Sequence, residues 1–247
     1  MLREYLAELH VHTVLSPCSD LLMTPANILK IAQRRGIEIL AVTDHNSAEN
    51  IEVLFELAKG SGVYILPGME VETKEEVHLV VLFDTLEQVL ALQELVYRHL
   101  PLLENDENHF GPQLLTDLKD NFVDRVSRLL AVSISLSLDE VVAHVERLGG
   151  LVYPAHVDRQ RNSILTQLGF IPSEPAFLAL EVSNRYFERG EFNPLFKNYP
   201  LIPAADVHFI DSLQGSVIFK IESPKVAEIK KALLREDGRN YYWRGSK

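Results

Sequence analysis

Apolar runs of strand length alternate along the chain with segments of helical period. The run at 37–43 is nearly all apolar and β-branched, which is typical of a strand buried on both faces in a parallel sheet. Similar runs predict strands at 5–11, 63–66, 77–83, 151–154, 177–182, 201–205 and 216–221. Helices are predicted between them at 24–35, 47–59, 86–100, 138–148 and 224–234. Pro67-Gly68 is expected to interrupt the third strand.

This alternation is typical of an α/β barrel or a doubly wound sheet. It breaks at 101–137, where a mixed, partly polar stretch carries amphipathic turns around 114–118 and 123–130. We interpret 101–137 as a helical insertion near the mouth of the fold, and an ordinary long connection is the alternative. The insertion is too short to form a core alone, so residues 1–247 are expected to form a single domain.

Amino-acid composition limits the cellular compartment and the binding partners that we expect for this chain. Formal net charge is −11, which argues against duplex nucleic-acid binding and favours a small phosphorylated substrate or a nucleotide. Cys18 is the one cysteine, so no intrachain disulfide is possible, which fits a reducing cytoplasm. Neither a signal-peptide core nor a membrane-spanning run is found. We therefore expect a cytoplasmic protein without a membrane partner, and its oligomeric state stays open.

Ionisable residues cluster where the apolar runs end. His10 and His12 are two residues apart on a predicted strand, so their side chains should point to the same side. Asp206 and His208 repeat this alternation near the other end of the chain. Four further sites lie near ends of apolar runs: Asp44-His45, Glu70, His78 and His156. Imidazole and carboxylate together suit divalent ions such as Zn²⁺, Mn²⁺ and Fe²⁺, and this set exceeds the needs of one ion.

The ordered set resembles the polymerase and histidinol phosphatase (PHP) family over nearly the whole chain. The resemblance implies a distorted (β/α)7, TIM-like barrel with two or three divalent ions, Zn, Mn or Fe. It also implies phosphoester hydrolysis, with a metal-activated hydroxide attacking phosphorus at a multinuclear site. The substrate would be a nucleotide, an oligonucleotide end or a small phosphomonoester.

The resemblance also implies a role for each residue. The implied metal ligands are His10, His12, Glu70 and Asp206 for one ion, Glu70, His78 and His156 for a second, and His45 and His208 for a third. Asp44 would orient a ligand imidazole. The family usually has Ser-Asp-Gly shortly after the first histidines, whereas this chain has Ser16-Pro17-Cys18-Ser19-Asp20. We expect Asp20 to complete the third site, with Cys18 as the other candidate.

A phosphate substrate also calls for a cationic clamp. Arg185, which follows a predicted strand, is the first choice, and Arg159, in the His156 loop, is the second. Asp206 or His208 would assist proton transfer to the leaving oxygen. Two alternatives remain open: an amidohydrolase-type C–N bond hydrolase, which would not depend on the arginine clamp, and a non-catalytic metal-binding PHP module.

Overall fold

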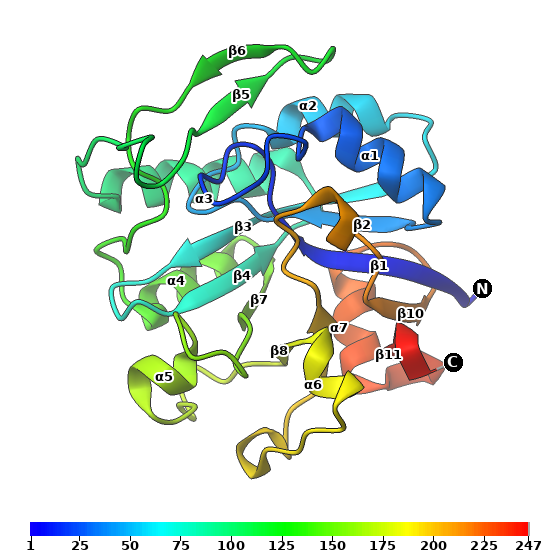
Figure 1. The fold of residues 1–247 in the computed structure, drawn as a ribbon. Helices are drawn as coiled ribbons and strands as arrows, with labels where there is room; N and C mark the ends of the chain where they lie inside the picture. The colour runs from blue at the N-terminus through cyan, green and yellow to red at the C-terminus, as the bar shows by residue number, and fades with distance from the viewer. Residues whose placement is uncertain (247) are drawn as a thin grey trace.

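A curled sheet of seven strands forms the centre of the protein (Figure 1), whose computed structural model describes residues 1–246. The strands follow the order β11 (Asn240–Trp243), β10 (Val217–Ile221), β1 (Arg3–Val11), β2 (Ile39–Val42), β3 (Tyr64–Glu72), β4 (His78–Leu82) and β7 (Leu151–Pro154). β1, β2 and β3 are parallel, whereas β10 runs antiparallel to β1, and β4 runs antiparallel to β3 and β7. The predicted α/β class is confirmed.

A separate parallel pair, β8 (Leu180–Ser183) and β9 (Leu201–Ala204), lies between the two arms of the curled sheet. After β9, Val207 exchanges backbone hydrogen bonds of 2.9 Å with His10 and His12 of the β1 segment. After β7, the Val157 amide donates to the Glu181 carbonyl of β8 at 2.9 Å. The fold is therefore a half-barrel closed loosely by this pair, and the regular (β/α)7 repeat is not seen in it.

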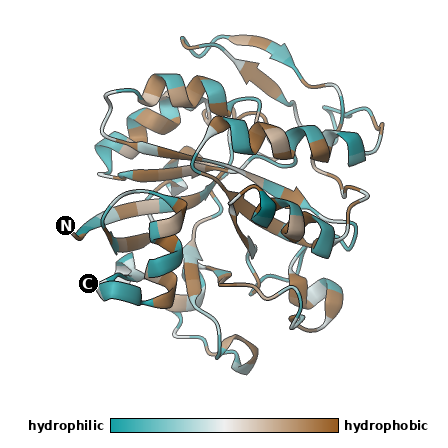
Figure 2. Cartoon of the chain, turned by 180° about the vertical axis from the view of Figure 1, so that it is seen from behind, coloured by the Kyte–Doolittle hydropathy of each residue, from teal (hydrophilic) through white to brown (hydrophobic). Residues whose placement is uncertain are grey.

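Helices cover the outside of the sheet because each carries one apolar face (Figure 2). Four helices contribute to the larger core: α1 (Pro25–Arg34), α2 (Ile51–Ala58), α3 (Leu86–His99) and α4 (Leu138–Arg147). α7 (Val226–Leu234) instead joins a second core with Tyr5 and Phe219. The short helices α5 (Ile164–Leu168) and α6 (Asn184–Glu188) lie in the loops after β7 and β8. Within residues 1–246, no helix has the length and apolar character needed to cross a membrane.

The strand β3 runs unbroken through Pro67-Gly68, so the predicted interruption is wrong. Its first half, up to Pro67, pairs in parallel with β2, and its second half, from Gly68, pairs with β4 in antiparallel. A Cβ on Gly68 would lie 2.6 Å from the Val81 carbonyl oxygen and 2.9 Å from the Thr43 methyl group. Glycine thus permits the change of partner, and the continuing strand carries Glu70 towards the centre of the fold.

Segment 101–137 contains no helix, so the helical character that we predicted for it is wrong. It forms a hairpin of β5 (Leu114–Thr116) and β6 (Phe122–Arg125). The Asp117 carboxylate accepts from the backbone amides of Lys119 and Asn121, a turn that reverses the chain at this point. The hairpin packs on the loop after β1, where the Leu114 amide donates to the Val14 carbonyl at 2.9 Å.

Candidate metal centre

Sheet direction brings the predicted site residues to one edge. β1, β2, β3 and β7 run the same way, and the bridge between Val11 and Val207 aligns the end of β9 with them. β4 runs the opposite way, so its first residue, His78, starts at this same edge. His156 and Asp206 follow β7 and β9 with positive φ values of 31° and 49°, which turn the chain sharply at the site.

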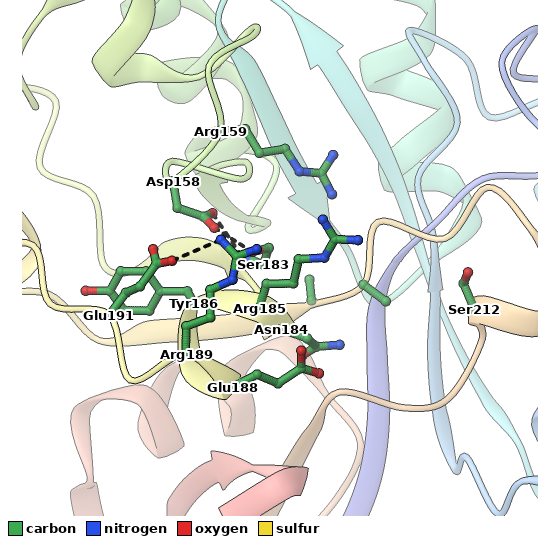
Figure 3. A pocket seen from close by; sticks show the side chains of 12 residues that line it. Asp158, Arg159, Ser183, Asn184, Arg185, Tyr186, Glu188, Arg189, Glu191 and Ser212 are labelled. Atoms are coloured by element: carbon green, nitrogen blue, oxygen red, sulfur yellow. Dashed lines mark hydrogen bonds and ion pairs between the residues drawn. The ribbon is translucent and has the colours of Figure 1, made fainter.

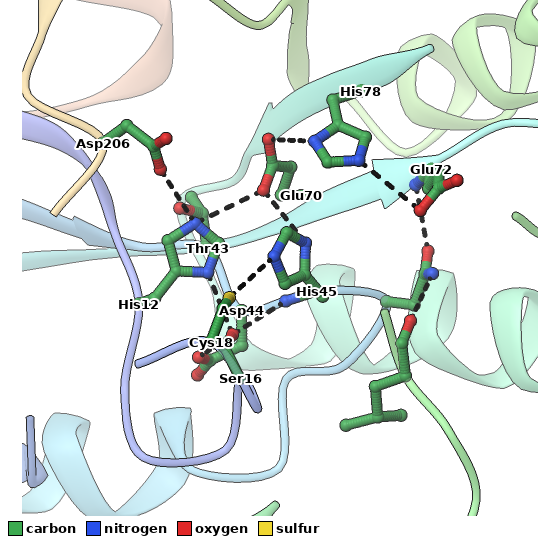
Figure 4. Close-up of polar contacts among 12 residues, drawn as sticks. His12, Ser16, Cys18, Thr43, Asp44, His45, Glu70, Glu72, His78 and Asp206 are labelled. Atoms are coloured by element: carbon green, nitrogen blue, oxygen red, sulfur yellow. Dashed lines mark hydrogen bonds and ion pairs between the residues drawn. The ribbon is translucent and has the colours of Figure 1, made fainter. Parts of the chain in front are cut away.

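Glu70 lies at the centre of this edge, with the two oxygens of its buried carboxylate facing five imidazoles. Figure 4 shows three of them, those of His12, His45 and His78. Its Oε1 lies 2.8 Å from Nδ1 of His78 and 3.2 Å from Nε2 of His156. Its Oε2 lies 3.0 Å from Nδ1 of His45 and 3.3 Å from Nε2 of His12. The fifth contact joins Oε1 to Nε2 of His10 at 3.4 Å.

Asp206 supplies a second buried carboxylate on the other side of His10 and His12. Its Oδ1 lies 3.3 Å from Nε2 of His10 and 3.2 Å from Nε2 of His12. The two Nε2 atoms are themselves 3.1 Å apart, so both rings do point to the same side, as predicted. His208 stacks on His12 with 4.2 Å between ring centroids.

The Nδ1 atoms of His10 and His12, which face away from Glu70, each donate to a fixed acceptor. Nδ1 of His10 faces both oxygens of the buried Glu181 carboxylate at 2.9 and 3.1 Å, so it must donate. Nδ1 of His12 lies 2.9 Å from the Ser16 hydroxyl, which itself donates to Asp44. These contacts fix the tautomers so that, in the neutral rings, both Nε2 lone pairs face the centre. Asp44 therefore reaches the His12 imidazole through Ser16 and not directly.

The centre strongly favours positive charge. Burial lowers the pKa of His78, but the carboxylates of Glu70 and Glu72 together outweigh burial and raise that pKa to about 10. Burial would raise the pKa of Glu70, yet the surrounding imidazoles hold it well below its usual range. His208 differs, because burial and the neighbouring His12 lower its pKa to about 3.

The donor set fits divalent ions. Ligands about 2.0–2.1 Å from a common ion lie about 3.0–3.4 Å from one another, and the contacts among Glu70, Asp206 and the imidazoles fall mostly in that range. The buried Nδ1 of His156 lacks a hydrogen-bond partner within residues 1–246, whereas His45 Nδ1, His78 Nε2 and Asp206 Oδ1 have contacts of 3.0 to 3.5 Å to site groups without hydrogen-bond geometry. Donor atoms cluster within 4.8 Å in three overlapping groups: His10/His12/Glu70, His45/Glu70/His78 and His12/His45/His208.

The loop after β1 places Cys18, and not Asp20, at the centre. The Asp20 carboxylate accepts from the Leu22 backbone amide at 2.8 Å and does not line the pocket over the metal-ligand candidates. The Cys18 sulfur lies 3.3 Å from Nε2 of His45 and lines that pocket. The structure therefore brings together the other predicted ligands and leaves Asp20 out.

The two predicted clamp residues lie in different positions. Arg159 lines the 470 Å³ pocket over the centre, and its guanidinium pairs with Asp206 Oδ2. Arg185 does not line that pocket; it lines an adjacent one of 580 Å³, which Arg159 also borders (Figure 3). The sequence analysis ranked Arg185 above Arg159 as the phosphate clamp, whereas the structure places Arg159 nearer the centre.

Sequence reasoning missed Glu181, which supports two of the predicted ligands. Besides holding His10, it accepts from the His156 backbone amide at 3.1 Å. The available signal was a single acidic residue inside the apolar run 177–182. A buried carboxylate without a partner is costly, so an acid in such a strand indicates a partner nearby.

The chain is similar to proteins of one family. The PHP domain family model matches residues 8–178. An uncharacterised protein of Methanocaldococcus jannaschii is 38% identical over 77 aligned positions, and the match covers 28% of this chain and 45% of that protein. Phosphoribosyl 1,2-cyclic phosphate 1,2-diphosphodiesterase of Eggerthella lenta is 38% identical over 64 residues, 26% of this chain and 23% of that enzyme. The chain thus spans less than half the length of these curated relatives.

Among solved structures, the chain has the fold of endonuclease Q from Pyrococcus furiosus. The two superpose with a TM-score of 0.69 at 20% sequence identity, over 97% of this chain and 58% of that one. A structure of endonuclease Q in complex with a 27-mer duplex substrate, with an abasic lesion at the active site, matches equally well. Our exclusion of duplex nucleic acid is therefore wrong, because net charge does not report the local field around a metal centre.

Proposed function

Because this chain belongs to the PHP domain family, we propose that it is a metal-dependent phosphoester hydrolase whose active site is the centre around Glu70. The observation that carries the proposal is the convergence of five imidazoles on one buried carboxylate. Two or three divalent ions, Zn, Mn or Fe, would bind this donor set. When bound, such ions neutralise charge on phosphoryl oxygens and activate water.

The protein's own residues would orient the ligands and the substrate. Glu181 and Ser16 hold the imidazoles of His10 and His12 with their Nε2 atoms towards the centre. Arg159 borders the pocket and would bind a phosphoryl oxygen. Asp206 and His208 line the same pocket, and we assign to them the proton transfer at the leaving oxygen.

Several substrates suit this site: a nucleotide, an oligonucleotide end or a small phosphomonoester. The pocket of 470 Å³ over the centre is open enough for any of them. Nucleic acid, including a duplex, belongs in the range to be tested, because endonuclease Q acts with the same fold. Net charge alone does not decide between them.

Hydrolysis of paired substrates by Mn²⁺-loaded protein tests the proposal. The pairs are a phosphomonoester and a phosphodiester, nucleotide and non-nucleotide, together with an abasic duplex. His10→Ala and Glu70→Gln should each lower turnover at least about 100-fold, whereas His109→Ala, at an exposed position in the hairpin segment, is the matched control. If metal-loaded protein turns over no phosphoester, the proposed function fails.

A further inference from the structure

Three ionisable side chains follow one face of β1. Glu8, His10 and His12 alternate along the strand, so they point to the same side, and all three are fully buried. The two imidazoles face the metal centre, but Glu8 has no part in the candidate ligand set. Within residues 1–246, its carboxylate forms no ion pair. Because burying a charged group without compensation is costly, a carboxylate at this position indicates a function.

The Glu8 carboxylate holds two other segments of the chain. Its Oε1 accepts from the Ala205 backbone amide at 3.2 Å, and its Oε2 accepts from the Ser216 hydroxyl at 2.5 Å. The Asn184 side-chain amide donates to the same hydroxyl at 2.8 Å, so the hydroxyl hydrogen is left for Glu8. Both carboxylate oxygens therefore act as acceptors, and they tie β1 to the residues that follow β9 and precede β10.

The residue that follows Ala205 is Asp206, whose backbone is strained. Asp206 has a φ of 49°, a left-handed conformation that a non-glycine residue keeps only where its surroundings impose it. Glu8 holds the residue before this turn. The backbone of the β1 segment holds the residue after it, because both the amide and the carbonyl of Val207 are bonded to that segment at 2.9 Å. The same strand thus fixes both sides of the turn.

This turn decides where the Asp206 carboxylate lies. Its Oδ1 is 3.3 Å from Nε2 of His10 and 3.2 Å from Nε2 of His12, and Figure 4 shows it directed at the His12 ring. His156, the other ligand candidate with a positive φ, has its backbone amide bound to the buried carboxylate of Glu181. A buried acid on another strand therefore supports each of these two turns.

We propose that Glu8 is a positioning residue of the metal centre, which sets the turn at Asp206 and so places that carboxylate against His10 and His12. The inference rests on the proposed function, because it takes this donor set as the site of the ions. Glu8 would act through the Ala205 amide and not as a ligand. Ion affinity should then depend on Glu8 only while Asp206 is present to bind the ion.

Zn²⁺ affinity, measured by competition with a chromophoric chelator, tests this dependence in a double-mutant cycle. Glu8→Ala should weaken Zn²⁺ binding about 10- to 100-fold, the usual effect of losing a group that orients a ligand. Glu8→Gln keeps the shape and one acceptor oxygen, so it should lose less. In Asp206→Ala protein, neither change should weaken binding further by more than about twofold. Glu4→Gln, at an exposed position on the same strand, is the matched control.

The cycle separates positioning from simple attraction. A carboxylate that only attracted the ion would strengthen binding with or without Asp206. An equal loss from Glu8→Ala in both backgrounds, or no loss in the wild-type background, would overturn the proposal. If circular dichroism shows that Glu8→Ala does not fold, Glu8→Gln decides the cycle by the same criterion.

Backbone amide exchange keeps this inference separate from the proposed function. In metal-free protein, the Ala205 amide should exchange at least about tenfold faster in Glu8→Ala than in the wild type, with Glu8→Gln between them. The amides of α2 should keep their wild-type rates, which a general loss of stability would not allow. Faster exchange confined to the turn supports the role of Glu8 even if no phosphoester is turned over. Unchanged exchange at Ala205 contradicts it even if hydrolysis is observed.

Discussion

At the scale of single residues, the centre depends on contacts one layer behind the metal-ligand candidates. Glu181 is fully enclosed and uses its carboxylate on the His10 ring and on the His156 backbone amide. The Ser16 hydroxyl links His12 to Asp44 in the same way. Each link sets which ring nitrogen carries hydrogen, so ion affinity should respond to residues that touch no ion.

Glu181→Gln is the direct test of this dependence. The amide keeps the shape but removes the charge that holds the His10 Nδ1 hydrogen, so Zn²⁺ affinity should fall about 10- to 100-fold. Competition with a chromophoric chelator measures it. Glu146→Gln, at an exposed position on α4, is the control. Unchanged affinity in Glu181→Gln would show that His10 is oriented without this contact.

Cys18 gives a second prediction at this scale. Its sulfur lies 3.3 Å from His45 Nε2, so an ion held by His45 and His208 should shield or bind the thiolate. Alkylation by iodoacetamide, followed by mass spectrometry, should slow roughly tenfold or more when Zn²⁺ is added. The single cysteine makes the signal unambiguous.

Asp20→Ala separates the two residues that the sequence offered for this site. If Cys18 is at the ion, protection by Zn²⁺ should persist in Asp20→Ala, because that carboxylate is bound to the Leu22 amide. Equal alkylation rates with and without saturating Zn²⁺ would contradict the placement of an ion beside Cys18.

At the scale of elements, the hairpin segment holds the start of α1. Thr24, the residue before the helix, forms no cap through its own side chain. Asp120 from the hairpin supplies it instead, accepting from the Thr24 hydroxyl at 2.7 Å and from the Ala26 amide at 3.1 Å. The first turn of α1 therefore depends on a segment more than ninety residues away in the chain.

Asp120→Ala should lower the free energy of unfolding by about 1–2 kcal/mol, the usual cost of losing a helix cap. Urea denaturation of the metal-loaded protein measures it. Asp120→Asn retains one acceptor oxygen and tolerates the positive φ of 61° at this position, so it should lose less. A loss below about 0.5 kcal/mol in Asp120→Ala, as for an ordinary surface change, would mean that α1 does not need this cap.

This segment is also an example of a feature that could not be predicted from the sequence. The edge of the sheet that carries the candidate metal centre was predictable, because the carboxyl ends of parallel strands lie on one side and the histidines follow apolar runs. The hairpin was not, because the apolar spacing in 114–130 suits either a helix or paired strands, and the Asp117 turn decided between them. Glu181 was missed because one acid in a buried run gives no periodic signal.

At the scale of the whole molecule, the charge of the chain is distributed unevenly. A net charge of −11 coexists with a pocket lined by three arginines and three acidic residues, and with a centre that favours cations. Composition averages over these regions, which is why net charge alone does not exclude a nucleic-acid partner. The same uneven charge makes the stability of the metal-free protein depend on pH.

Metal-free protein should lose stability as pH rises from 7 to 10. His78 has a folded-state pKa of about 10, against about 6.5 for an unfolded histidine. Its pairing with Glu70 therefore stabilises the fold fully below about pH 6.5 and is lost as pH rises through about 10. His208, with a pKa lowered to about 3, has the opposite effect, but only below about pH 6.5.

Bound ions should reverse this trend, because ligand imidazoles must be deprotonated and ion binding strengthens as pH rises. The gap in thermal midpoint between Zn²⁺-loaded and chelator-treated protein should therefore widen from pH 7 to pH 10. In chelator-treated His78→Gln the alkaline decline should be shallower, since the residue that loses the proton is gone. Parallel pH curves for loaded and metal-free protein would show that the imidazoles around Glu70 neither hold protons in the metal-free state nor release them to a metal.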